Sequence, residues 1–87
     1  MTARFQFYDD DPDWPVEGWH TWEGERHGDA YRADGARIGV TGAHGRWYGR
    51  GPAGALLRGP GGRLRYFTRP SRAARAVDER WPRGETA

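Results

Sequence analysis

Charged and apolar residues alternate from Arg63 to Phe67, which is the pattern of a strand with one buried face. Pro70 follows, and its fixed φ suits the first position of a helix. Beyond it an apolar stripe recurs at helical spacing, formed by Ala73, Ala74, Val77 and Trp81. Pro82 then stops the pattern. The sequence therefore predicts a strand over residues 63–67 that leads directly into a helix over residues 70–81.

Shorter strand-like segments precede this unit. The dipeptide Asp34-Gly35 stands between two of them and is the strongest hairpin signal in the chain. The run Gly59-Pro-Gly-Gly62 is typical of a turn. Residues 9–18 cannot continue a strand, because adjacent acids repel one another and two prolines remove ladder donors. The remaining pattern predicts strands or short β-prone pieces at residues 4–8, 19–22, 29–33, 37–41 and 46–50.

Alternation also assigns the two faces of the expected sheet. Ile38, Val40 and Trp47 fall on one side, where the stripe of the helix would cover them. Leu64 and Tyr66 are expected on that same side. The fold class is therefore α+β: a small antiparallel β-sheet of three or more strands with one C-terminal α-helix packed on one face. The residues expected in the core are Trp47, Leu64, Ala74 and Val77.

We expect residues 1–87 to form a single domain. Within it, residues 1–28 make an acidic, tryptophan-rich N-terminal segment, and residues 29–81 make the core of sheet and helix.

The opposite face of the expected sheet is lined with arginine. Guanidinium groups pair with phosphates or with guanine, and a tyrosine can stack or bind phosphate. Cations at a helix N-terminus oppose the helix dipole, which hints that an anion neutralises them. These arguments favour nucleic-acid binding; a solvated face that pairs with the acidic half of the chain is the alternative. The candidate binding residues are Arg46, Tyr48, Arg50, Arg63 and Arg65 on the sheet, with Arg69 at the helix start.

Charge is distributed unevenly along the chain. The formal net charge is only +2, but residues 1–34 hold nine acids against three arginines, and residues 35–87 hold eleven arginines against three acids. Such asymmetry favours a polyanionic partner. It is equally explained if the two halves pair with each other in the fold.

Other classes of function find little support. There is no cysteine, and His20, His27, Asp29 and His44 lack the spacing of metal ligands, so no metal or other cofactor is expected. No nucleophilic triad or phosphate-binding loop is present, which argues against an enzyme. The chain has no apolar run of membrane length and no signal-peptide pattern. A soluble, cytoplasmic protein without membrane contact is expected.

Three blocks of residues resemble the AP2 family of DNA-binding domains, which includes the arm-binding domains of phage integrases. They are Gly39-Val40, Gly45-Arg46-Trp47 and the run from Phe67 to Asp78. The resemblance covers about residues 37–81. It implies a three-stranded antiparallel sheet with one packing helix, which binds DNA through the exposed sheet face. Gly51-Pro52 breaks the strand that continues past the tryptophan in that family, so only modest sequence preference is expected.

The acidic segment from Asp9 to Glu25 has three interpretations. It could cover the sheet as a structural lid, because its own Trp14, Trp19 and Trp22 would otherwise expose a large apolar patch. It could contact a basic protein partner, or it could occupy the arginine face as an autoinhibitory mimic of DNA. The first functional hypothesis rests on the arginine face: the partner is DNA, with RNA as an alternative. The second hypothesis is a protein-interaction module, or a small inhibitor or accessory protein of phage or bacterial type, that uses this segment.

Overall fold

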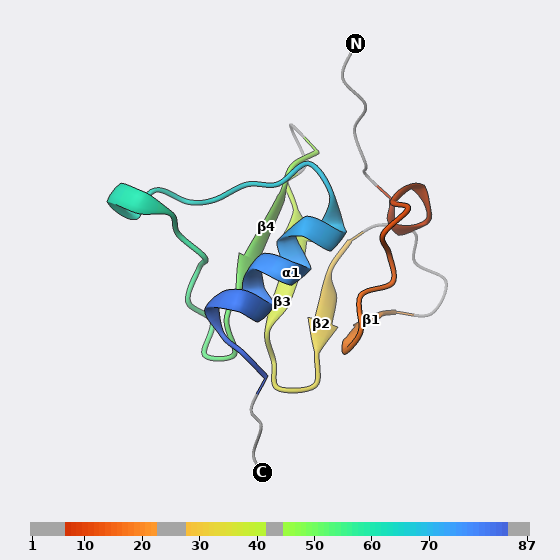
Figure 1. Cartoon of the computed structure of the whole chain (residues 1–87), viewed down its shortest axis with the longest axis horizontal. Helices are drawn as coiled ribbons and strands as arrows, with labels where there is room; N and C mark the ends of the chain where they lie inside the picture. Colours follow the sequence, from red (N-terminus) through yellow and green to blue (C-terminus); the bar gives the residue numbers. More distant parts are fainter. Residues whose placement is uncertain (1–6, 23–27, 42–44, 84–87) are drawn as a thin grey trace.

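Four short strands form one antiparallel sheet whose spatial order follows the chain order, β1-β2-β3-β4. The computed structural model describes residues 7–22, 28–41 and 45–83. The α+β fold with one sheet and one C-terminal helix is confirmed (Figure 1). The elements are the 3₁₀ turn η1 (Tyr8–Asp10), strands β1 (Trp19–Thr21), β2 (Ala30–Arg32), β3 (Arg37–Val40) and β4 (Trp47–Arg50), the 3₁₀ turn η2 (Pro60–Gly62) and helix α1 (Pro70–Arg80).

The predicted hairpin at Asp34-Gly35 joins β2 to β3. Gly35 has a φ of 100°, a conformation that costs glycine nothing and other residues much. The Asp34 carboxylate accepts a hydrogen bond from the Ala36 amide at 3.2 Å, as expected of an aspartate in a turn. The turn fixes a register in which Tyr31 pairs with Arg37 and Ala30 pairs with Ile38.

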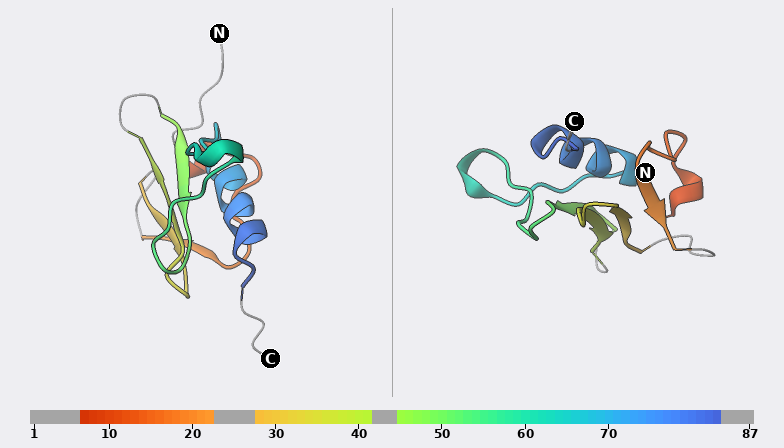
Figure 2. Two further views of the ribbon diagram at one scale, coloured as in Figure 1. Left: turned by 90° about the vertical axis from the view of Figure 1, so that its left-hand side faces the viewer. Right: turned by 90° about the horizontal axis from the view of Figure 1, so that it is seen from below.

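Helix α1 and the sheet form two layers (Figure 2). Ala73, Ala74 and Val77 are fully buried on the sheet side of the helix, as the apolar stripe predicts. The predicted inward position of Trp47 is also confirmed, because its side chain is completely buried. Trp81 is the C-cap of the helix and is half-buried, with its amide donating to the Val77 carbonyl.

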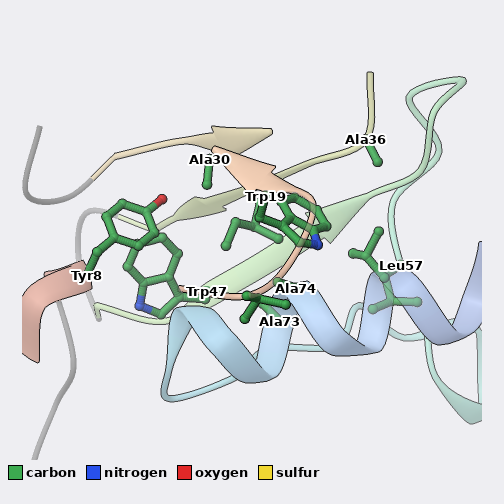
Figure 3. Close-up of a cluster of buried hydrophobic side chains, with 11 residues drawn as sticks. Tyr8, Trp19, Ala30, Ala36, Trp47, Leu57, Ala73 and Ala74 are labelled. Carbon is green, nitrogen blue, oxygen red and sulfur yellow. The ribbon is translucent and has the colours of Figure 1, made fainter. Parts of the chain in front are cut away.

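The N-terminal segment packs on the helix side of the sheet. The Tyr8 ring lies 4.6 Å from Trp14 and 5.2 Å from Trp47, and Figure 3 shows Tyr8 and Trp47 next to each other. Val16 and Trp19 are also buried in the core. This segment therefore completes the hydrophobic core beside the helix.

Asp11 links the N-terminal segment to the start of the helix. The N-cap residue of α1, Arg69, makes no capping hydrogen bond with its side chain. Instead the buried Asp11 carboxylate accepts the Ser71 amide at 2.9 Å, through its Oδ2 atom, and the Asp13 amide at 2.9 Å, through its Oδ1 atom. Asp13 in turn pairs with Arg69 at 3.2 Å. The anion expected near the helix N-terminus is thus supplied by the chain itself.

The prediction of a last strand over residues 63–67 is wrong, because no continuous strand forms there. The chain from Leu56 to Tyr66 forms a projecting arm, which is joined by isolated bridges at Arg50–Leu56, Arg58–Leu64 and Trp47–Phe67. In Figure 1 the arm extends to the left, with η2 at its tip. Gly61 and Gly62 have φ of 77° and 79°, and at this glycine-rich tip the chain reverses and returns toward the sheet, which it meets again at Phe67. Leu57 fills the core, while Leu64 is only half-buried and Tyr66 is exposed.

The direction of Arg65 is also opposite to the prediction. Phe67 exchanges two backbone hydrogen bonds of 2.8 Å with Trp47, so the two side chains share the helix side of the sheet. The Arg65 guanidinium lies 4.9 Å above the Phe67 ring. Arg65 therefore lies on the helix side. The prediction differs because it assumes the alternation of a strand that does not form.

The sequence predicts a strand over residues 4–8, but the last two of these residues are not in a strand. Phe7 lies outside any strand, and Tyr8 begins the 3₁₀ turn η1. Residues 4–6 lie outside the described part of the chain.

Candidate nucleic-acid interface

One row of side chains crosses the sheet on the face opposite α1. His20 pairs with Tyr31 across β1 and β2, Tyr31 pairs with Arg37 across β2 and β3, and Arg37 pairs with Arg50 across β3 and β4. Directly opposed residues of an antiparallel sheet point to the same face. Since Ala30, Ile38 and Gly49 alternate with this row and face the helix, the row points away from it.

A second row lies beside the first. Gly39 pairs with Tyr48, and a Cβ atom at Gly39 would lie 2.8 Å from both the Tyr48 hydroxyl and an Asp29 carboxylate oxygen. The side chains of Tyr48 and Asp29 therefore lie over Gly39. Arg46 precedes Tyr48 by two residues and is exposed. Glycine at position 39 gives the tyrosine and the carboxylate room to approach each other.

These two rows, with Trp22 beside Tyr31, form a surface that we call the outer face. Its charged groups in the described chain are Arg37, Arg46 and Arg50 against the single carboxylate of Asp29, with His20 exposed at the β1 side. Arg37 and Asp29 pair at 3.5 Å, and about half of each side chain is accessible to water. The members of the outer face are His20, Trp22, Asp29, Tyr31, Arg37, Gly39, Arg46, Tyr48 and Arg50.

The structure brings together three of the six residues that the sequence proposed as a site. Arg46, Tyr48 and Arg50 lie on the outer face, and Arg50 also donates a hydrogen bond to the Gly54 carbonyl at 2.9 Å. Arg63 and Arg65 are exposed on the arm. Arg69 precedes the helix on the other side of the sheet and pairs with Asp13. The six residues therefore do not form one surface.

The acidic segment leaves the outer face uncovered where its position is described. Asp11 and Asp13 bind the start of α1, which packs on the opposite side of the sheet. Trp14 is half-buried and Trp19 is buried there, as a lid requires, whereas Trp22 is 61% exposed. The two charge-rich halves of the chain thus pair in part at the helix, and Arg46 and Arg50 are not among the groups that these contacts pair.

The binding residues proposed from the sequence leave out the part of the outer face on or beside β1, β2 and β3, formed by Trp22, Asp29, Tyr31 and Arg37, although alternation already placed Arg37 outward. The signal was present in the sequence. The Asp34-Gly35 turn fixes Tyr31 opposite Arg37, and alternation in β3 then places Arg37 outward. The burial of Arg32, by contrast, depends on its contact with Asp78, which the sequence does not place beside it.

Arg32 is the centre of a buried ionic cluster on the helix side. Its side chain is 1% exposed and donates to Asp34 through Nε (3.0 Å) and Nη2 (2.6 Å), and to Asp78 through Nη1 at 2.9 Å. Burial disfavours the charged form, but the hydrogen bonds and charges of the two carboxylates outweigh it and raise the pKa of Arg32. The hydrogen bond from Arg32 is the main cause that lowers the pKa of Asp34. This satisfied cluster ties β2 to the helix and is structural.

Two shallow hollows meet at Arg37 on the outer face. One, of about 440 Å³, is lined by Trp22, Asp29, Tyr31, Arg32, Ala33, Gly35 and Arg37. The other, of about 530 Å³, lies toward the turn after β4 and is lined by Gly35, Arg37, Tyr48, Arg50 and residues 51–54. Both are open, and a single arginine borders both.

The described residues contain no group of three or more side chains that could hold a metal ion. Among the same residues no helix is long and apolar enough to cross a membrane. Comparison with known proteins adds no assignment: no family model, no curated protein and no solved structure matches this chain.

Proposed function

We propose that this protein is a non-enzymatic nucleic-acid-binding domain that holds DNA or RNA on its outer face, mainly through phosphate contacts. The observation that carries the proposal is the joint position of Arg37, Arg46 and Arg50 on one open sheet face, with the half-buried ring of Tyr48 among them. Guanidinium groups bind phosphate oxygens as charge-assisted pairs. Rings on an open sheet offer stacking surfaces to bases.

The charge pattern supports the same face. Asp11 and Asp13 of the N-terminal segment bind partners at the helix, so a polyanion on the outer face would not meet these two carboxylates. Asp29 does lie on the outer face, but its pair with Arg37 is exposed and therefore weak. The resemblance to AP2-like domains, whose exposed sheet face binds DNA, points to the corresponding surface.

The experiment is a salt series of binding to random duplex DNA, single-stranded DNA and RNA. If three arginines each neutralise one phosphate, log K against log salt should fall with a slope of about −2 to −3. The variant R46A/R50A should flatten the slope on duplex DNA by about two units. The matched control is R72A/R75A, which removes the same charge from the exposed side of the helix and should change the slope by less than about 0.5.

Two results would contradict the proposal. One is a wild-type protein that binds none of the three nucleic acids at low salt and micromolar concentration. The other is an equal loss of affinity in R46A/R50A and R72A/R75A, which would mean that net charge rather than the outer face attracts the polyanion. In the first case the protein-interaction hypothesis would take the lead.

A further inference from the structure

Three rings lie in contact at the β1–β2 end of the outer face. The Trp22 ring is 5.2 Å from the Tyr31 ring at an interplanar angle of 38°, and the His20 ring is 5.8 Å from Tyr31 at 42°. Trp22 is the most exposed large apolar side chain of the described residues, at 61%. Its indole is supported from one side by Tyr31 and presents much of its surface to water. An indole held in this way is a stacking platform for another flat ring.

The hollow beside this platform has both aromatic and charged side chains in its lining. Trp22 and Tyr31 supply the rings, and Asp29 and Arg37 supply the charges. The volume of about 440 Å³ lies in the range of small-ligand sites, which bury a flat apolar body and orient it by a few polar groups. A nucleobase has this character, because its faces stack and its edge carries donors and acceptors.

The paired charges of the hollow have a specific complement. Asp29 offers carboxylate oxygens and Arg37 offers guanidinium donors, 3.5 Å apart and about half exposed. The Watson–Crick edge of guanine carries two adjacent donors, N1–H and N2–H, next to the acceptor O6. A carboxylate can accept both donors while a neighbouring guanidinium donates to O6. Adenine, cytosine and thymine each present only one donor position on that edge.

We propose that this hollow binds an unpaired guanine, which stacks on Trp22 and is read by Asp29 and Arg37. The inference rests on the proposed function and names its substrate class: a single strand that contains guanine. In a duplex the Watson–Crick edge is already paired and both faces of the base are stacked, so the hollow cannot use them. Arg46, just before β4, and Arg50, at its end, are left to contact the phosphates of the same strand.

The test uses fluorescein-labelled oligonucleotides of twelve nucleotides in fluorescence anisotropy. They are a thymidine tract, the same tract with one central guanine, adenine or cytosine, and a random duplex. The wild-type protein should bind the guanine-containing strand about tenfold more tightly than the plain tract, since one stacked and hydrogen-bonded base has at least this effect. The duplex should bind more weakly than the guanine-containing strand.

Substitutions at Trp22 and at Asp29 test separately the stacking of the guanine and the hydrogen bonds to its Watson–Crick edge. W22L should weaken binding of the guanine strand about tenfold, while W22F, which keeps a ring, should retain most of the affinity. D29N should reduce the guanine preference to about twofold or less, and it should bind the plain tract as tightly as the wild type or more tightly, because a negative charge has been removed. Thermal melts should show that these exposed substitutions leave the fold intact.

Failure of the inference is distinguishable from failure of the proposed function. If W22L and D29N bind every strand as the wild type does, while R46A/R50A loses affinity, the guanine site is wrong and phosphate binding on the outer face stands. Equal affinity for the four single strands also overturns the site. If the wild type binds no oligonucleotide at all, both proposals fall together.

Discussion

Val77 of α1 occupies the space directly above Gly49 of β4 in which any other residue would place its Cβ atom. A Cβ built on Gly49 would overlap the Cγ2 atom of Val77, and the Leu57 side chain lies 3.8 Å away on another side. Both Gly49 and Val77 are buried. The absence of a side chain at position 49 therefore sets how closely the helix approaches the sheet.

Gly49→Ala should destabilise the protein by about 1–3 kcal/mol, because a methyl group is forced into a packed layer. The Gly49 backbone does not have a positive φ, so the cost is steric. The double variant G49A/V77A should be more stable than the sum of the two single changes predicts by about 1 kcal/mol or more. Urea unfolding of the four proteins measures this coupling. Strict additivity would show that the helix shifts to absorb the methyl group without strain.

Asp11→Ala should lower the free energy of unfolding by about 1–3 kcal/mol, because it leaves the buried Ser71 amide without its acceptor. The matched control is Asp10→Ala, which changes the adjacent exposed acid and should stay within about 0.5 kcal/mol of the wild type. Denaturant melts of both variants provide the comparison. Equal losses in the two variants would mean that general charge in the segment, and not the cap, stabilises α1.

Ser71→Ala should leave stability unchanged or raise it by up to about 1 kcal/mol. The Ser71 hydroxyl is buried and has no hydrogen-bond partner among the described residues, so its removal relieves a desolvated polar group. Alanine also has the higher helix propensity. The amide at this position is untouched, and its bond to Asp11 persists. A loss above about 1 kcal/mol in thermal unfolding would show that the hydroxyl has a partner after all.

The sequence predicted those elements that local chemistry determines. Asp34-Gly35 encodes its own turn, and the spacing of Ala73, Ala74 and Val77 encodes a helix face. The alternation around Trp47 correctly gave the two faces of β4, and with them Arg46, Tyr48 and Arg50 of the outer face.

The predictions that are wrong concern residues whose position depends on partners far away in the sequence. Residues 63–67 have strand-like alternation, but they form the returning limb of the arm. Leu64 bridges Arg58 within the arm, and Phe67 bridges β4 at Trp47. Arg32 is buried because Asp34 and Asp78 together satisfy its guanidinium, and one of these lies 46 residues away. Without that contact a charged side chain is expected to point outward, which conflicts with the outward direction of Tyr31 that its pairing with Arg37 indicates.

Acid should weaken the fold through Asp34. Its folded-state pKa lies below the ordinary value, because it accepts hydrogen bonds from Arg32. The unfolded chain therefore binds the proton more readily, so this contribution to stability is present above about pH 4 and is lost as pH falls through the lower folded pKa. Asp34→Asn keeps an acceptor for the Ala36 amide but removes the charge. Urea melts between pH 6 and pH 3 should show a shallower loss of stability in D34N than in the wild type, and parallel curves would contradict the assignment.

Arg63 and Arg65 lie on the arm and not on the outer face. Because Arg65 lies over Phe67 on the helix side and Arg63 is exposed on the arm beyond the edge of β4, neither is placed with Arg46 and Arg50. The variant R63A/R65A should therefore change the salt slope of nucleic-acid binding by less than one unit, against about two for R46A/R50A. It removes the same number of charges, so the pair of variants compares position alone. A change of two units in R63A/R65A would mean that the polyanion extends past β4 along the arm, and the proposed interface would then have to include these two arginines.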